Sequence, residues 1–242
     1  MIYIILAAGE GQSLAPLTVK YPKTSYKLDS STTIIQRMVG LIRKLDDNAE
    51  IVAVVGYRSE LIKKELEDYD VKFVINPFYK ITGSISSLWF ARKYLERDNI
   101  TILHGDVVFD DDVMRDVVVK PTDRPYVVID SSCTNPDSYS VGIKDDEVLV
   151  MGTNLDNPHA EYCCMTKLDA VSGRILKEEI SQMVENNVYD IHYEDSLVHM
   201  IMFSDFDLYY EDIKGCGWKQ INDINDVLKT KYIHRQSEYR GL

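Results

Sequence analysis

Features that would assign the chain to a membrane, a secretory pathway or a nucleic acid are missing from the sequence. It has no run of about 18 apolar residues, the length that a membrane-spanning helix needs, and its N-terminus lacks the charged lead-in and cleavage site of a signal peptide. Lysine and arginine number 27 against 39 aspartates and glutamates, so the formal net charge is -12. Because nucleic acids and anionic membranes select for basic surfaces, we expect a cytoplasmic protein that binds neither.

Cysteine is scarce, and two common phosphate-binding motifs are absent. The cysteines lack the spacing of a metal site or a disulfide framework, and we expect them to be reduced and structural. No Gly-x-x-x-x-Gly-Lys-Ser/Thr sequence of a P-loop occurs, and Leu14 stands where a dinucleotide fingerprint needs its third glycine. The four cysteines are Cys133, Cys163, Cys164 and Cys216.

The strongest signal that is present lies in residues 2–28, IYIILAAGEGQSLAPLTVKYPKTSYKL. The opening apolar run predicts a buried strand. The next helical pattern begins only near Thr33, after a connection of roughly 20 residues where about 4 to 6 are usual. Gly9 and Gly11 allow backbone N–H groups to approach a ligand, and Lys23 adds local positive charge. This composition suits a polyphosphate, although many Gly-x-Gly turns bind nothing.

Short apolar runs alternate with helical patterns up to about residue 110, which predicts parallel β-α-β units in an α/β fold. After Pro121 the pattern changes to closely spaced strands, including a hairpin that turns at 145–147. Strands are expected at 2–8, 51–55, 71–75, 100–103, 126–129, 141–144, 148–151, 162–168 and 208–210. Helices are expected from 33, at 60–67, at 86–95, at 172–185 and at the end of the chain.

The sequence LAAGEGQSLAPLT followed by YPK resembles the signature loop of the nucleotidyltransferases that activate sugar phosphates and phospho-alcohols, the MobA-like and LicC-like NTP transferase fold. This resemblance implies a Rossmann-like, mostly parallel sheet flanked by helices, with an antiparallel extension on the acceptor side. It further implies a single domain, with a nucleotide-binding half at 1–120 and an acceptor-binding half at 121–242. The arginine that grips the β and γ phosphates in the family aligns with Ser13. The loop residues expected at the nucleotide are Leu6, Ala7, Ala8, Gly9, Gly11, Gln12 and Ser13.

Asp106 follows a predicted parallel strand, at the edge where ligands bind in open α/β sheets. A turn or helix-capping aspartate is the alternative. The resemblance implies that Asp106 holds Mg²⁺, whose preferred ligands are oxygen atoms, and that Lys23 is the catalytic cation on the phosphates. The second metal carboxylate of the family aligns with Asn222, and Asp223 is adjacent, so either is a candidate ligand; Asp223 is equally well explained as a helix N-cap.

The segment NPFYKITGSISSLWFARKYL resembles the phosphocholine cytidylyltransferase branch of the family. The resemblance implies CTP as the nucleotide rather than dTTP or UTP, and places Gly83, Ser84 and Ser86 near the base and ribose. Trp89 and Phe90 in the same segment are equally well explained as core residues.

For the acceptor, the sequence offers an aromatic and acidic set of residues that would suit an ammonium group. A solvated acidic helix start is the alternative. His104, His192 and His199 lack a metal-like arrangement and are interpreted as structural. The candidate acceptor residues are Tyr139, Tyr193, Glu194, Asp195 and Trp218.

Together these features predict an Mg²⁺-dependent cytidylyltransferase that transfers CMP from CTP to a small phosphorylated acceptor and releases pyrophosphate. Phosphocholine is the first acceptor to consider, followed by phosphoethanolamine, a phosphonate or a phospho-amino acid such as phosphoglutamine, whose activated products serve surface polysaccharide biosynthesis. A homodimer is one option. The alternatives are a sugar-1-phosphate nucleotidyltransferase and a catalytically impaired nucleotide-binding homologue, which the replacements at Ser13 and Asn222 suggest.

Overall fold

The structure is a computed structural model that describes residues 1–135 and 138–240. Four parallel strands form the first part of a nine-stranded sheet, in the order β3-β2-β1-β4. Their β-branched residues alternate between two buried faces, as expected for a sheet covered by helices on both sides. The four strands are β1 (Ile2–Ala7), β2 (Glu50–Val55), β3 (Val71–Ile75) and β4 (Ile100–His104).

The sheet continues beyond β4 with five strands that are mostly antiparallel, in the order β9-β6-β10-β8-β7. β9 is antiparallel to both β4 and β6, and it therefore joins the two parts of the sheet. The predicted α/β fold class with an antiparallel extension is confirmed. The five strands are β6 (Tyr126–Asp130), β7 (Ser140–Lys144), β8 (Glu147–Gly152), β9 (Ala160–Leu168) and β10 (Tyr209–Asp212).

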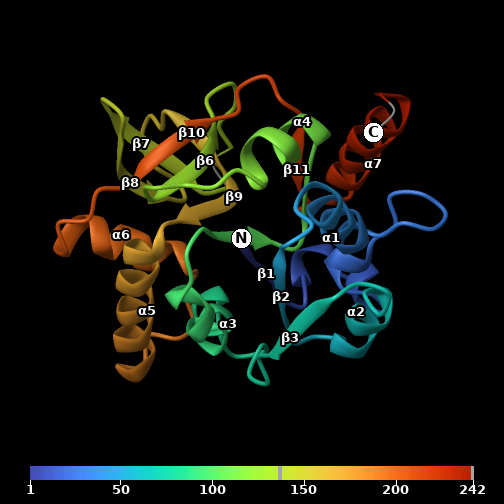
Figure 1. Ribbon diagram of the computed structural model, residues 1–242, viewed down its shortest axis with the longest axis horizontal. Coiled ribbons are helices and arrows are strands. Elements are labelled where there is room, and N and C mark those ends of the chain that lie inside the picture. The colour runs from blue at the N-terminus through green and yellow to red at the C-terminus, as the bar shows by residue number, and fades with distance from the viewer. Residues whose placement is uncertain (136–137, 241–242) are drawn as a thin grey trace.

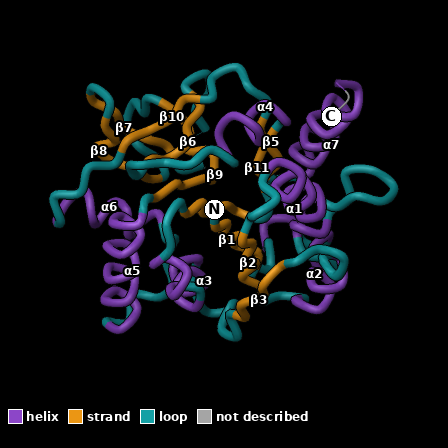
Figure 2. The backbone as a smooth tube through the Cα atoms, in the orientation of Figure 1, coloured by secondary structure: helices purple, strands orange, loops and turns teal. Residues whose placement is uncertain are grey.

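Helices cover both faces of the sheet (Figures 1 and 2). One face packs against α1 (Ile34–Leu45) and α2 (Ser59–Glu65). The other packs against α3 (Ser84–Phe90), α5 (Ala170–Glu185) and α6 (Glu194–Phe203). The sequence pattern did not predict α6, and α3 begins two residues earlier than expected and ends at Phe90, where a 3-10 turn (Arg92–Glu96) follows.

A capping box stands at the start of α1. The Thr33 side chain accepts a hydrogen bond from the Gln36 backbone N–H, and the Gln36 side chain accepts one from the Thr33 backbone N–H. Each bond satisfies an N–H that the helix itself leaves without a partner. The box fixes where the helix begins and, with it, where the long loop after β1 ends.

A second, two-stranded sheet lies beside the large one. β5 (Val107–Phe109) follows β4 directly and pairs with β11 (Trp218–Gln220), which comes from near the C-terminus. Short helical turns, α4 (Asp111–Val113) and a π-helix at Met114–Val118, follow β5, and α7 (Ile224–Arg240) follows β11. This small sheet brings the residues after the metal candidate Asp106 next to the late segment around Asn222.

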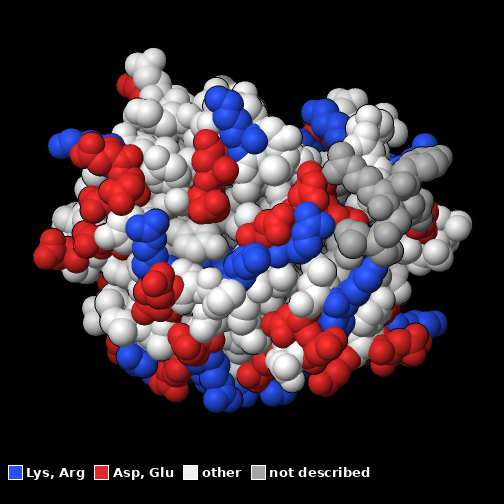
Figure 3. Space-filling model, turned by 45° about the horizontal axis from the view of Figure 1, so that its top comes forward, with Lys and Arg blue, Asp and Glu red and all other residues white. Residues whose placement is uncertain are grey.

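Charged side chains of both signs lie on the surface. Acidic and basic side chains are intermixed on the face shown in Figure 3. All four cysteines are unpaired. None of the helices in the described residues combines the length and apolar character required to cross a membrane.

Candidate active site

The loop after β1 folds into three short 3-10 turns, at Gln12–Leu14, Leu17–Val19 and Lys23–Ser25. Gly11 precedes the first turn with φ 66° and ψ 46°, in the left-handed region. A Cβ atom at Gly11 would lie 2.6 Å from Cγ of Lys23. The position therefore needs glycine for two reasons, its backbone conformation and the close approach of Lys23.

Lys23 is held at the junction of the two sheets. Its Nζ donates a hydrogen bond of 3.0 Å to the carbonyl oxygen of Ile221 and lies 3.6 Å from Oδ2 of Asp106. Gln220 Nε2 lies 3.4 Å from the other carboxylate oxygen of Asp106. Residues from the first loop, the end of β4 and β11 thus meet around one lysine and one carboxylate.

These residues line a cavity of about 340 Å³. Its floor is the carboxyl edge of β1 and β4, where open α/β sheets bind ligands. The backbone of the glycine loop forms one wall, and the start of α3 forms another. The lining residues are Leu6, Ala7, Ala8, Gly9, Gly11, Lys23, Thr24, Tyr79, Thr82, Gly83, Ser84, Ser87, His104, Asp106, His192, Gln220 and Asn222.

Most of the residues predicted for the nucleotide line this cavity, and Gln12 and Ser86 do not. Gln12 is exposed, and its side chain donates to Glu10. Ser86 is buried and donates to the carbonyl oxygen of Tyr189 at 2.8 Å, because it lies on the face of α3 that packs inward, and the neighbouring Ser87 lines the cavity instead. The side chain of Ser13 lies outside the described residues.

The predicted acceptor segment 193–195 does not present its polar groups to a ligand. Tyr193 is fully buried, with its hydroxyl 2.6 Å from that of Tyr162. Asp195 accepts hydrogen bonds from the hydroxyl of Tyr139 at 2.8 Å and from the backbone N–H of His192 at 3.1 Å. The segment is therefore the start of α6, as the alternative interpretation held; Tyr193 and Asp195 have protein partners, whereas Oε2 of Glu194 is buried without a hydrogen-bond partner among the described residues.

Glu194, the third member of that segment, is 1% exposed and pairs with His104. The distance between Oε1 of Glu194 and Nε2 of His104 is 2.6 Å. Burial alone would lower the pKa of His104, but the neighbouring carboxylate outweighs it and raises the pKa above its ordinary value. The sequence interpretation of His104 as a structural residue missed that it lines the cavity, and only its place at the end of a parallel strand pointed there.

Two further predicted residues lie away from the cavity. Asp223 accepts hydrogen bonds from the backbone N–H groups of Asn225 at 2.6 Å and Asp226 at 3.1 Å, so it serves the first turn of α7, as the alternative interpretation held. Trp218 donates from Nε1 to Oδ2 of Asp130 at 2.9 Å and lines a different cavity. Neither side chain lines the cavity that contains Asp106.

The oxygen donors in the cavity fit a magnesium ion that also binds phosphates. Within the described residues, no group of three or more His, Cys, Asp or Glu side chains is arranged to hold a metal. Mg²⁺ needs no such cage, because it is usually bound by one or two carboxylates together with water and substrate phosphates. Asp106 supplies a carboxylate and Asn222 an amide oxygen in the same cavity, so these two residues are the candidates to hold the ion.

Comparison with known proteins supports the resemblance. Bifunctional protein GlmU from Methanocaldococcus jannaschii is 28% identical over 95% of this chain, which spans only about half (53%) of that relative. CTP:phosphoglutamine cytidylyltransferase from Campylobacter jejuni is 29% identical over 77% of this chain and 80% of its own length. Choline-phosphate cytidylyltransferase from Streptococcus pneumoniae is 25% identical over 95% of this chain and 96% of its own length.

Solved structures show the same fold. That of CTP:phosphocholine cytidylyltransferase from Streptococcus pneumoniae superposes with a TM-score of 0.78 at 21% identity, covering 96% of this chain and 99% of the other. The sequence model of the MobA-like NTP transferase domain matches residues 3–136, more than half of the 242 residues. The matched range contains the glycine loop, Lys23, α3 and Asp106. The chain therefore belongs to the family of nucleotidyltransferases with a MobA-like NTP transferase domain.

Proposed function

We propose that the protein is an Mg²⁺-dependent cytidylyltransferase that transfers CMP from CTP to a small phosphorylated acceptor. The observation that carries the proposal is the meeting of Lys23, Asp106 and the glycine loop in one cavity. Relatives named as cytidylyltransferases for phosphoglutamine and choline phosphate, and a CMP-5'-(3-aminopropyl)phosphonate synthase from Streptomyces rubellomurinus, support the choice of CTP.

The chain's own residues would position the triphosphate. Backbone N–H groups of the loop after β1 would face the phosphates, and the ammonium of Lys23 would offset the charge that builds on the departing pyrophosphate. Ser13 stands where the family has an arginine, so Lys23 would carry more of this charge stabilisation. Gly83 and Ser84, at the start of α3, would lie beside the base and ribose.

Asp106 and Asn222 would hold the magnesium ion, which when bound neutralises charge on the phosphates. An oxygen of the acceptor phosphate would attack the α phosphorus of CTP in line with the departing group. One P–O bond forms, the bond to the β phosphate breaks, and pyrophosphate leaves. The acceptor oxygen is already anionic, so the step needs neither a protein nucleophile nor a general base.

The test is pyrophosphate release in the presence of Mg²⁺. Each common nucleoside triphosphate is paired with phosphocholine, phosphoethanolamine, phosphoglutamine, an aminoalkylphosphonate and several sugar 1-phosphates. Release with CTP and one phosphorylated amine, amino acid or phosphonate is the expected result. Release only with UTP, dTTP or GTP and a sugar 1-phosphate would support the second candidate instead, which the sugar-phosphate relatives favour. No release with any pair, while CTP still raises the melting temperature, would indicate an impaired homologue.

A further inference from the structure

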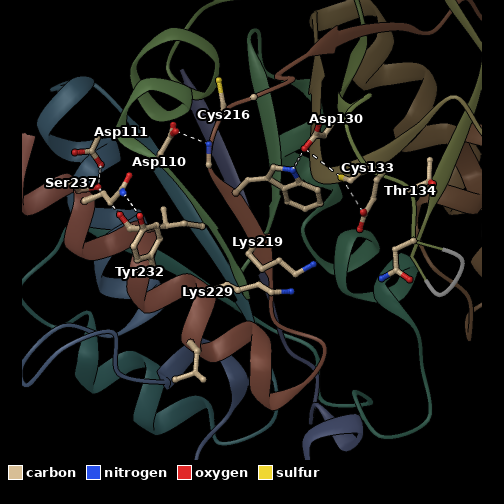
Figure 4. A pocket seen from close by; sticks show the side chains of 18 residues that line it. Asp110, Asp111, Asp130, Cys133, Thr134, Cys216, Lys219, Lys229, Tyr232 and Ser237 are labelled. Atoms are coloured by element: carbon tan, nitrogen blue, oxygen red, sulfur yellow. Dashed lines mark hydrogen bonds between the residues drawn. The ribbon is translucent and has the colours of Figure 1, made fainter.

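A second cavity, of about 820 Å³, also borders the small sheet and has no part in the proposed reaction (Figure 4). β11 and α7 form one side of it, and the ends of β6 and β9 form the other. Trp218 and Lys219 line this cavity, whereas Gln220 and Asn222 line the cavity with Asp106. No residue that lines one cavity lines the other.

A buried carboxylate in this cavity has no cationic partner. Glu161 is 5% exposed, and the one hydrogen bond to its side chain comes from the thiol of Cys133, at 3.4 Å. Among the described residues no lysine, arginine or histidine lies within ion-pair distance of it. A buried carboxylate without a cation is costly, because burial removes its water and a thiol is only a weak donor. Within the described residues Glu161 therefore has no ion-pair partner, and a cationic ligand that reached it would supply one.

A second carboxylate stands beside it. Asp130 is also 5% exposed and accepts from Cys133 at 3.4 Å, so a single S–H serves both acids. Burial raises the pKa of the Cys133 thiol to about 12, which keeps the thiol protonated. Hydrogen bonds from Ser132 and Trp218 outweigh burial and hold the pKa of Asp130 below its ordinary value, so Asp130 is ionised.

An aromatic wall completes this end of the cavity. The indole of Trp218 is fixed by its 2.9 Å hydrogen bond to Asp130. Tryptophan is the best aromatic partner for a cation, especially where water is excluded. The sequence analysis singled out Trp218 as part of an aromatic and acidic site for an ammonium group; in the structure it bonds to Asp130 and lines the same cavity as Glu161, away from the segment 193–195.

Positive charge lies next to the indole: Nζ of Lys219 is 5.9 Å from the centroid of the Trp218 ring. Lys219 from β11 and Lys229 from α7 extend side by side (Figure 4). Their Nζ atoms lie 3.6 Å and 3.5 Å from the same oxygen of Asp226, so two ammonium groups share one carboxylate. This pair can accept a further anion.

We propose that this cavity is a binding site for a small zwitterion, with an organic ammonium group between Glu161 and Trp218 and an anionic group at Lys219 and Lys229. The ammonium group would be the cationic partner that Glu161 lacks among the described residues. The anionic group would join Asp226 as a second negative partner of Lys219 and Lys229. The site is independent of CTP and of Asp106, so it stands whether or not the proposed reaction does.

The test uses fluorescence of Trp218 in a Trp89→Phe background, titrated with phosphocholine in the absence of nucleotide. A saturable change is expected, weakened by roughly tenfold or more in Glu161→Gln. The matched control, Glu185→Gln, makes the same chemical change at an exposed position of α5 and should bind as the parent does. Asp106→Asn should also bind normally, which separates this site from the nucleotide cavity.

A second experiment uses the unaltered protein, so its result does not depend on correct folding of the Glu161 variant. Calorimetry should show that choline binds and that its uncharged carbon isostere does not, because only choline carries the positive charge. Lys229→Gln should weaken phosphocholine while leaving choline unchanged. Equal binding of choline and its isostere, no saturation at millimolar phosphocholine, or binding that is lost in Asp106→Asn but kept in Glu161→Gln would each overturn the proposal.

Discussion

Residues 1–120 and residues 121–242 use their polar groups differently. Residues 1–120 supply most of the cavity through the backbone of a glycine loop, a strand end and one lysine, and His192, Gln220 and Asn222 complete it. In residues 121–242 the predicted tyrosine and carboxylates of α6 are bonded to other parts of the protein. A site built from the backbone of one loop uses residues that are close together in the sequence, so it can be predicted from the sequence. The hydrogen-bond partner of a side chain can lie far away in the chain, so it is known only from the folded structure.

The largest expected effect is a loss of catalytic rate and comes from a substitution within residues 1–120. Asp106→Asn should lower kcat/KM for CTP on the order of 10³-fold, because the amide removes the one carboxylate offered to the metal in that cavity. Steady-state pyrophosphate release measures it. The control, Asp190→Asn, changes an exposed aspartate in the loop before α6 and should keep full activity. Full activity of Asp106→Asn would remove this residue from the site.

A substitution at the start of α6, in residues 121–242, should change the stability of the fold. Glu194→Ala should lower the free energy of unfolding by about 3 kcal/mol, since it leaves His104 without the partner of a buried ion pair. Urea denaturation measures the change, and Glu185→Ala at an exposed position should stay near the parent. If Glu194→Ala keeps its stability and loses only acceptor binding, the contrast between the halves fails.

A smaller effect is expected from the glycine loop. Gly11→Ala should cost about 2 kcal/mol of stability, because alanine is disfavoured at φ 66° and its Cβ would meet the Lys23 side chain. Activity should fall as Lys23 moves. Gly9→Ala is the matched control: no atom lies within 4 Å of a Cβ at Gly9, so its free energy of unfolding should hardly change. Equal destabilisation by the two substitutions would contradict this reading of the loop.

The effect that is smallest at neutral pH concerns β9, the strand that joins the two parts of the large sheet. Lys167 is fully buried and donates to the carbonyl oxygens of Val117, Val118 and Lys120. Burial lowers its pKa from 10.5 to about 7. Between about pH 7 and 10.5 the unfolded chain binds the proton and the folded chain does not, so stability should rise with pH across this window and level off below pH 7.

Relative to Lys167→Met, the parent should therefore gain roughly 1 kcal/mol of stability per pH unit above pH 7. Urea denaturation at several pH values measures this slope. Lys44→Met changes an exposed lysine and should show no such difference. A parent and a Lys167→Met variant with parallel pH profiles would show that Lys167 stays charged in the folded protein.

The fold could be predicted from sequence where neighbouring elements are also neighbours in the chain. β1 to β4 and the capping box of α1 follow from alternating apolar patterns and one local motif. The β7–β8 hairpin was predictable for the same reason. By contrast, β5 and β11 are three residues each and are strands only because they pair with one another across more than 100 residues.

The candidate site divides in the same way. The glycine loop, Lys23 and Asp106 carry a recognisable local pattern. The contacts of Trp218 with Asp130 and of His104 with Glu194 join residues 88 and 90 positions apart, and no pattern within either segment reveals them. Polar residues of the right type were identified, but their partners were not.

The bond between Lys23 and the carbonyl oxygen of Ile221 has a consequence for biosynthesis. The two residues are 198 positions apart, a span that a ribosome needs roughly 10 to 40 seconds to translate. During that interval a nascent chain can form its parallel strands and present the glycine loop, while the lysine lacks the acceptor that holds it. The arrangement around Lys23 is thus completed only when β11 pairs with β5, so that a chain released before residue 221 would retain the glycine loop and lack the carbonyl group that holds its lysine.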